Sequence, residues 1–206
     1  MNRAATWLLW LAVLSLVPGC LSRPPLHTQT VAFDPPAGSV PKESARSKRV
    51  VSIRSMRVAA PFEDRSLVYR VGEFSYESDP YAAFLVSPAE SLRVPIRSWM
   101  RQSDLFRSVV EPGSALRPNT MAEITVVELY GDFRPDPAAV LTLRFVLLDS
   151  PEGIPGKLIF EQEYSRRVVL KDRNANALMT GWNDALNQIL GQLGSDLRRL
   201  DSAPGF

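Results

Sequence analysis

Few side chains in this sequence have the type and spacing that catalysis or metal binding needs. The chain has one cysteine, Cys20, and one histidine, His27, both near its start. A lone histidine there excludes a histidine triad, a histidine metal site and a histidine proton shuttle in the folded part. The carboxylate pairs Glu63-Asp64 and Glu161/Glu163 could be proposed for acid–base work, but exposed charge explains them better. We therefore expect no catalytic residue, no cofactor and no metal ligand.

Cys20 follows an apolar run and is itself followed closely by two prolines. The residues from Trp7 to Val17 are apolar apart from Ser15, after the weakly basic start Met1-Asn2-Arg3. This run of about 11 residues suits the h-region of a secretory signal and is shorter than the ~20 residues of a membrane-spanning helix. A single cysteine cannot form an internal disulfide, so another role is needed for it.

The segment Val17-Pro18-Gly19-Cys20 resembles the bacterial lipobox. The resemblance implies cleavage after Gly19 and a diacylglycerol on the sulfur of Cys20, so that residues 1–19 form a lipoprotein signal peptide. Leu21 stands where an aspartate would signal inner-membrane retention. The resemblance therefore implies a lipid anchor in the inner leaflet of the outer membrane, with the protein facing the periplasm. The alternative is a plain signal peptide, or an apolar helix that happens to contain Cys20.

The composition after the leader fits one globular domain. Hydrophobic residues make up 45% of the chain and charged residues 22%, and the net charge of +2 gives no reason to expect nucleic acid. Five of the 17 prolines lie between Arg23 and Pro41, which favours an extended tether over residues 20–49. A short edge strand at Thr28–Phe33 is the alternative for part of it. The domain is predicted to span 50–201, with a tail at 202–206.

Basic residues gather near the end of this tether and in the strand after it. The cluster comprises Lys42, Arg46, Lys48, Arg49, Arg54 and Arg57, with Glu43 as the only acidic neighbour. Contact with anionic lipid headgroups is one interpretation of this cluster. The other is a solvated tether end that continues into the exposed face of a first strand.

Hydrophobic periodicity predicts an α/β domain with two main helices. Ser87-Pro88-Ala89-Glu90 is a capping box with proline at the first helical position, and an apolar stripe continues from it past Pro95 to Met100. A longer amphipathic helix is expected from Asn174 to Leu200. The predicted strands form a mixed, mainly antiparallel sheet with a plausible hairpin at Val71-Gly72. They are Val50–Val58, Ser66–Tyr69, Phe74–Tyr76, Leu105–Val110, Ala122–Leu129, Val140–Leu148 and Lys157–Val169.

The order of these features resembles the ABC-type transport auxiliary lipoproteins, a PqiC-like family. The features are Cys20, the strand Val50–Val58, Asp64-Arg65 followed by Leu67-Val68-Tyr69-Arg70, Tyr76, Asp79-Pro80-Tyr81, and the helices with Trp99 and Trp182. The resemblance implies a single domain similar to the N-terminal domain of TolB. It also implies a non-enzymatic role beside an ABC transporter with an MCE (MlaD-like) component, in lipid transport across the envelope. MCE-domain protein, transporter subunits and a homo-oligomeric ring are the implied partners.

Four aromatic residues are candidates for the contact with such a partner: Phe74, Tyr76, Tyr81 and Phe84. The alternative for them is ordinary packing of the hairpin on the first helix. A second function is a tethered activator or scaffold of a peptidoglycan synthase, which needs a tether that crosses the periplasm. A tether of under 30 residues spans at most ~90 Å, which favours the transport role. A lipoprotein that binds a soluble ligand is a third possibility.

Overall fold

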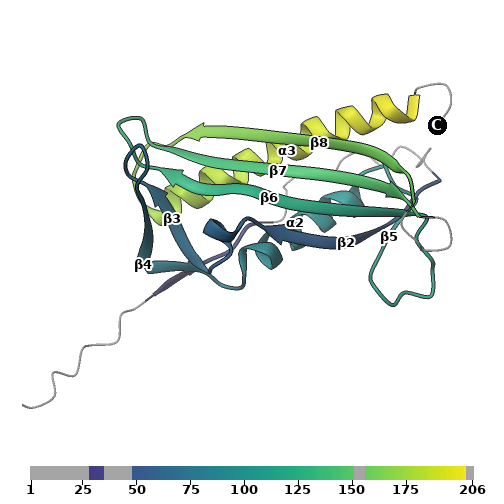
Figure 1. Cartoon of the computed structure of the whole chain (residues 1–206), viewed down its shortest axis with the longest axis horizontal. Helices are drawn as coiled ribbons and strands as arrows, with labels where there is room; N and C mark the ends of the chain where they lie inside the picture. Colours follow the sequence, from purple (N-terminus) through teal and green to yellow (C-terminus); the bar gives the residue numbers. More distant parts are fainter. Residues whose placement is uncertain (1–27, 35–47, 151–155, 203–206) are drawn as a thin grey trace, which may run out of the picture.

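The computed structural model describes residues 28–34, 48–150 and 156–202. The predicted signal peptide, Cys20, most of the predicted tether, the turn at Pro151-Glu152-Gly153 and nearly all of the tail lie outside these residues. In the described part, eight strands form one open mixed sheet, and two helices pack on one of its faces (Figure 1). The predicted fold class, a single α/β domain with a mixed sheet and two main helices, is confirmed.

The long strands form an antiparallel meander, as predicted. They are β6 (Thr120–Asp132), β7 (Ala138–Asp149) and β8 (Leu158–Val169), each paired with the next along almost its whole length. Alternate residues of β7, from Leu141 through Leu143 and Phe145 to Leu147, are all buried. Period-two alternation therefore identified the face of this strand that meets the helices.

Shorter strands pair with the other edge of β6 and make the sheet mixed. They are β1 (Gln29–Val31), β2 (Val50–Val58), β3 (Ser66–Arg70), β4 (Tyr76–Phe84) and β5 (Ser108–Val110). β2 runs parallel to the first half of β6 and β3 runs parallel to its end. β5 extends the sheet beyond β2, while β4 and then β1 extend it beyond β3. The sheet therefore divides beyond β6 into two short wings.

The first helix, α2 (Pro88–Gln102), begins where the capping motif predicts. The Ser87 hydroxyl accepts a hydrogen bond from the Glu90 amide at 3.4 Å, and Pro88 occupies the first helical turn. The helix continues through Pro95, which is buried together with Leu92 and Ile96. Tertiary packing of this apolar stripe outweighs the backbone hydrogen bond that a proline removes.

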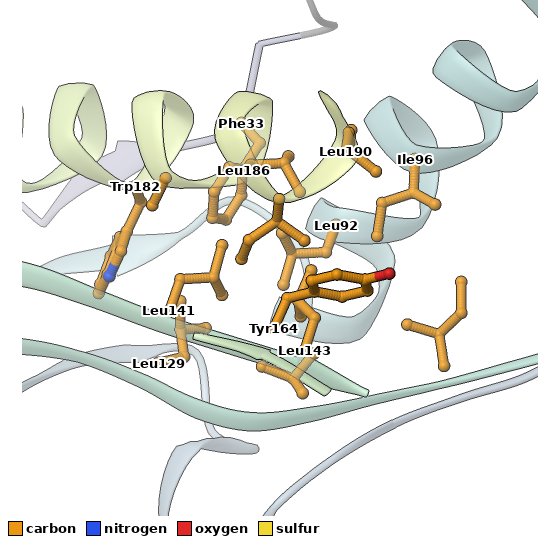
Figure 2. Close-up of a cluster of buried hydrophobic side chains, with 14 of the residues drawn as sticks. Phe33, Leu92, Ile96, Leu129, Leu141, Leu143, Tyr164, Trp182, Leu186 and Leu190 are labelled. Atoms are coloured by element: carbon orange, nitrogen blue, oxygen red, sulfur yellow. The ribbon is translucent and has the colours of Figure 1, made fainter. Parts of the chain in front are cut away.

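The second helix, α3 (Ala175–Ser202), lies across β7 and β8 and supplies much of the core. Figure 2 shows Trp182, Leu186 and Leu190 of this helix above Leu141 and Leu143 of β7. Close approach depends on Gly181, where a Cβ atom would lie 2.7 Å from Cβ of Ala139. That distance is too short for two carbons, so glycine is required at this contact.

The start of the domain corrects the tether prediction. Residues 28–34 do not belong to a free tether, because β1 pairs with the end of β4. Phe33 is buried and stacks on Phe84 and Trp182, with ring centroids 6.0 and 6.3 Å away. The edge-strand alternative for Thr28–Phe33 is therefore confirmed, and the folded domain includes residues that lie well before position 50.

The described members of the basic cluster support the solvated interpretation. Arg49 forms an ion pair with Asp201, in the last turn of α3, and Arg54 forms one with Glu123 at 2.7 Å. Arg57 is exposed. Neither of the two described helices has an apolar stretch that could cross a bilayer.

Candidate interaction surface

The β3–β4 hairpin carries the exposed aromatic residues that the sequence singled out. Arg70 of β3 pairs with Tyr76 of β4, and the Val71 amide donates to the Ser75 carbonyl at 3.0 Å to close the turn. Phe74, in this turn, is 87% exposed. The hairpin at Val71-Gly72 is confirmed, and its tip presents an uncovered phenyl ring to solvent.

β4 contains a bulge in the region of Tyr81. Val68 pairs with Ser78 and Ser66 pairs with Ala83, so four residues of β4, 79–82, stand opposite Leu67 alone. Pro80 lies within this bulge, where its missing amide hydrogen removes no ladder bond. The bulge leaves Tyr81 60% exposed.

Asp79 holds the bulge in place. One carboxylate oxygen accepts hydrogen bonds from the amides of Tyr81 and Ala82, at 2.7 and 2.9 Å. The other oxygen accepts a hydrogen bond from the hydroxyl of Tyr69. Burial, and then the neighbouring carboxylate, raise the pKa of Tyr69 well above its usual value. The hydroxyl therefore remains a donor, and Tyr69 fixes Asp79 to the neighbouring strand.

Phe84 does not belong to this surface. Toward the end of β4, Ala82 and Phe84 both face the core, and Phe84 is only 1% exposed. Its ring stacks on Trp182 with centroids 5.6 Å apart. The prediction that Phe84 contacts a partner is therefore wrong, because the residue is a central part of the core.

The side chain of Tyr76 is partly packed and partly exposed. It is 48% exposed, and its ring meets the edge of Tyr130 with centroids 5.7 Å apart. The Arg70 guanidinium lies over the ring of Tyr76, 5.8 Å from its centroid. The packing alternative thus holds in part for Tyr76, although its contact is on β6 and not on the first helix.

A buried carboxylate braces the neighbouring turn between β6 and β7. Asp132 is 1% exposed and accepts hydrogen bonds from Arg134, at 2.8 and 2.7 Å, and from Arg167 of β8 at 2.6 Å. These hydrogen bonds, with those from Arg134 acting most strongly, hold the pKa of Asp132 far below its usual range. Arg173 donates to the Arg134 carbonyl at 3.0 Å and ties the loop before α3 to the same turn.

Removing both arginines of this cluster should destabilise the domain more than the two single changes added together. Either Arg134→Ala or Arg167→Ala leaves Asp132 with one cation, whereas the double variant leaves a buried carboxylate without one. We expect each single change to cost little and the pair to cost about 3 kcal/mol, measured by urea unfolding of the unlipidated protein. Glu163→Gln is the control, because its ion pair with Arg144 is largely exposed and contributes about 1 kcal/mol or less.

The pH dependence of the double variant should run opposite to that of the wild type. In the wild type the lowered pKa of Asp132 stabilises the fold above pH ~4, and this stabilisation is lost as the pH falls further. In the double variant burial raises this pKa, so acidification toward pH 5 should recover stability. The prediction fails if the losses of stability in the two single variants simply add up to that of the double variant. It also fails if acid does not restore the stability of the double variant, because Asp132 then does not need its two arginines.

The chain enters the domain beside Tyr81. Gln29 pairs with Ala82, so Thr28, the first described residue, comes in next to Tyr81. The Gln29 side chain donates to Asn176 at 2.7 Å, in the first turn of α3. One end of the molecule, which we call the entry end, therefore holds the point of entry, the β3–β4 hairpin and the β6–β7 turn (Figure 1).

The remaining chemical candidates are exposed charges, as expected. Glu63, Asp64, Glu161 and Glu163 are all exposed, and Glu163 pairs with Arg144 at 3.0 Å. Within the described residues no group of histidine, cysteine or carboxylate side chains is placed to hold a metal ion. Sequence reasoning noted Asp79 only as part of Asp79-Pro80-Tyr81 and gave it no role, and it missed Asp132. The Asp-Pro dipeptide could have indicated a break in β4, but no local signal marks Asp132 as buried.

Comparison with known proteins supports the fold. No protein-family model and no curated protein matches this chain. The chain is similar in structure to a Xanthomonas campestris protein of family DUF330, with a TM-score of 0.64 and 16% identity over 83% of this chain and 94% of that one. An uncharacterized protein matches with a TM-score of 0.59 and 13% identity, over 72% of this chain and 92% of that one.

A weaker structural likeness is to lipoprotein GNA1162 from Neisseria meningitidis. Its TM-score is 0.32 at 14% identity, over 66% of this chain and 98% of that chain. At that score we base no argument on it. The two stronger matches, both under 20% identity, establish that the chain shares their α/β fold, and its function has to be argued from the chain itself.

Proposed function

We propose that this protein is an outer-membrane lipoprotein that serves an ABC/MCE transport system for lipids or other apolar molecules. It acts by docking and not by catalysis, and it uses no cofactor beyond the lipid on Cys20. Its support is the lipobox-like segment that ends at Cys20, the order of sequence features that resembles the PqiC-like family, and an α/β fold shared with a DUF330 protein.

The observation that carries this proposal is the length of chain between Cys20 and the domain. Because β1 is part of the sheet, only the segment from Cys20 to Thr28 remains as a spacer. Eight residues reach at most ~28 Å even when fully extended. The domain would therefore stay close to the membrane that holds the lipid, which suits a part that receives a periplasmic assembly at that membrane.

The same length disfavours the alternative role. A tethered activator of a peptidoglycan synthase has to reach an enzyme at the inner membrane. The predicted tether allowed ~90 Å, and the spacer left by the structure is about a third of that. The transport role is therefore favoured more strongly than it was by the sequence alone.

Cross-linking in intact cells, followed by mass spectrometry of the captured proteins, tests the proposal. We expect recovery of an MCE-domain protein together with subunits of an ABC transporter. Capture of a peptidoglycan synthase without these proteins would contradict the transport role and support the tethered activator. The sequence suggested Phe74, Tyr76 and Tyr81 as contacts for a partner, and what covers them is considered next.

A further inference from the structure

Several large apolar side chains are exposed at the entry end. Phe74 is 87% exposed and Tyr81 60%, and Val71 and Tyr76 are also exposed beside them. Val169, at the end of β8, is 74% exposed and pairs with Ala138, next to the β6–β7 turn. The β3–β4 hairpin and the end of β8, which carry these residues, lie at the same end of the sheet (Figure 1).

The charges at this end do not select for a strongly charged partner. Lys171 and Arg173 are exposed in the loop before α3, and Asp172 stands between them. Glu73 and Glu77 flank the aromatic residues of the hairpin. A surface of mixed sign with exposed aromatic and aliphatic side chains suits the boundary between headgroups and acyl chains, where tyrosine and other amphipathic rings are enriched.

The position of the lipid anchor points to the same occupant. The chain reaches the domain beside Tyr81, and Cys20 lies only eight residues earlier in the sequence. The opposite end is much farther from the anchor, since α3 runs ~42 Å from its first turn at the entry end to the turn that holds Asp201. A spacer of at most ~28 Å therefore keeps the entry end nearest to the bilayer.

We propose that the entry end rests on the membrane that holds the anchor, with Phe74, Tyr81 and Val169 in contact with lipid. This inference relies on the lipid at Cys20, which is part of the proposed function. The occupant is the bilayer itself and not the transport partner. A periplasmic partner would then meet the open face of the sheet or the far end, near Arg49 and Leu116.

Fluorescence from an environment-sensitive label tests this orientation. The full-length lipidated protein would be placed in vesicles of phosphatidylethanolamine and phosphatidylglycerol. An NBD label would be attached to the new cysteine of the Phe74→Cys variant or of the Tyr81→Cys variant. That cysteine is the only free thiol in each variant, because lipid occupies Cys20. We expect blue-shifted emission and strong quenching by nitroxide-labelled lipid at both positions. The matched control is Leu116→Cys, which is 50% exposed in the loop before β6 and should show neither effect.

Vesicle flotation separates failure of this inference from failure of the proposed function. Protein that does not float with the vesicles lacks the anchor, and the proposed function and the orientation then both fail. Protein that floats while labels at positions 74 and 81 behave like the label at position 116 overturns the orientation alone. A blue shift that appears only after the captured partner proteins are added would mean that protein covers this end, and that result also overturns the inference.

Discussion

The Cys20→Ala variant is expected to lose its covalent lipid and to disappear from the outer-membrane fraction. A thioether on Cys20 is the membrane attachment that the proposed function requires, and neither described helix can cross a bilayer. Several acyl chains, at ~0.8 kcal/mol per buried CH₂, hold a protein on a membrane stably, whereas three exposed side chains at the entry end do not. Cell fractionation with radioactive palmitate labelling measures both losses.

The neighbouring substitution Ser22→Ala is the matched control for this experiment. It also changes one small side chain beside the predicted cleavage site but leaves the thiol in place, so label and outer-membrane location should be kept. Retention of Cys20→Ala in the outer membrane without label would contradict the lipoprotein assignment. Such a result would leave the domain fold unaffected, because no described residue depends on Cys20.

Long, strongly periodic segments were predictable from the sequence because burial imposes its period over many residues. In β7, four alternate apolar residues, Leu141 to Leu147, face the core as expected. The stripe of α3 includes Leu178, Trp182 and Leu186, which are almost completely buried. The start of α2 was predictable for a different reason, since Ser87 and Pro88 satisfy local requirements of a helix N-terminus.

Features set by tertiary contacts were not predictable in the same way. β1 has three residues, too few to show a period, and it is held by its pairing with β4 and by Phe33 against the core. The edge strand could therefore be suggested from Thr28–Phe33 but not preferred over a tether. Its presence changes the functional argument, since it shortens the spacer after Cys20 to eight residues.

Three of the four candidate contact residues are exposed, and the fourth, Phe84, is buried. Tyr81 and Phe84 are three residues apart, so an unbroken strand would put them on opposite faces. The sequence grouped them because both are aromatic and close in the chain. Period-two alternation along β4 would have separated them, because Phe84 shares the buried face with Ala82.

The Trp182→Ala variant is expected to lose about 3–5 kcal/mol of unfolding free energy. Trp182 is completely buried, and its ring stacks on Phe84 and Phe33, from β4 and the segment after β1. Its indole nitrogen also donates to the Val140 carbonyl at 3.0 Å. Alanine would leave a cavity where α3, β7, β4 and the segment after β1 meet, and a domain of this size has only ~5–15 kcal/mol in total. Urea unfolding of the unlipidated protein, followed by circular dichroism, measures the loss.

The Trp182→Phe variant separates the ring from the hydrogen bond. Phenylalanine keeps most of the apolar volume but cannot donate to Val140, so we expect a smaller loss of about 1–2 kcal/mol. Loss of the aromatic stack should also release β1, because Phe33 then has only Phe84 as an aromatic neighbour. Faster amide exchange at Val31 in Trp182→Ala than in Trp182→Phe would show this release, and the spacer after Cys20 would lengthen as β1 detaches. Equal stability of the two variants, with equal amide exchange at Val31, would mean that the ring of Trp182 does not hold β1 in place.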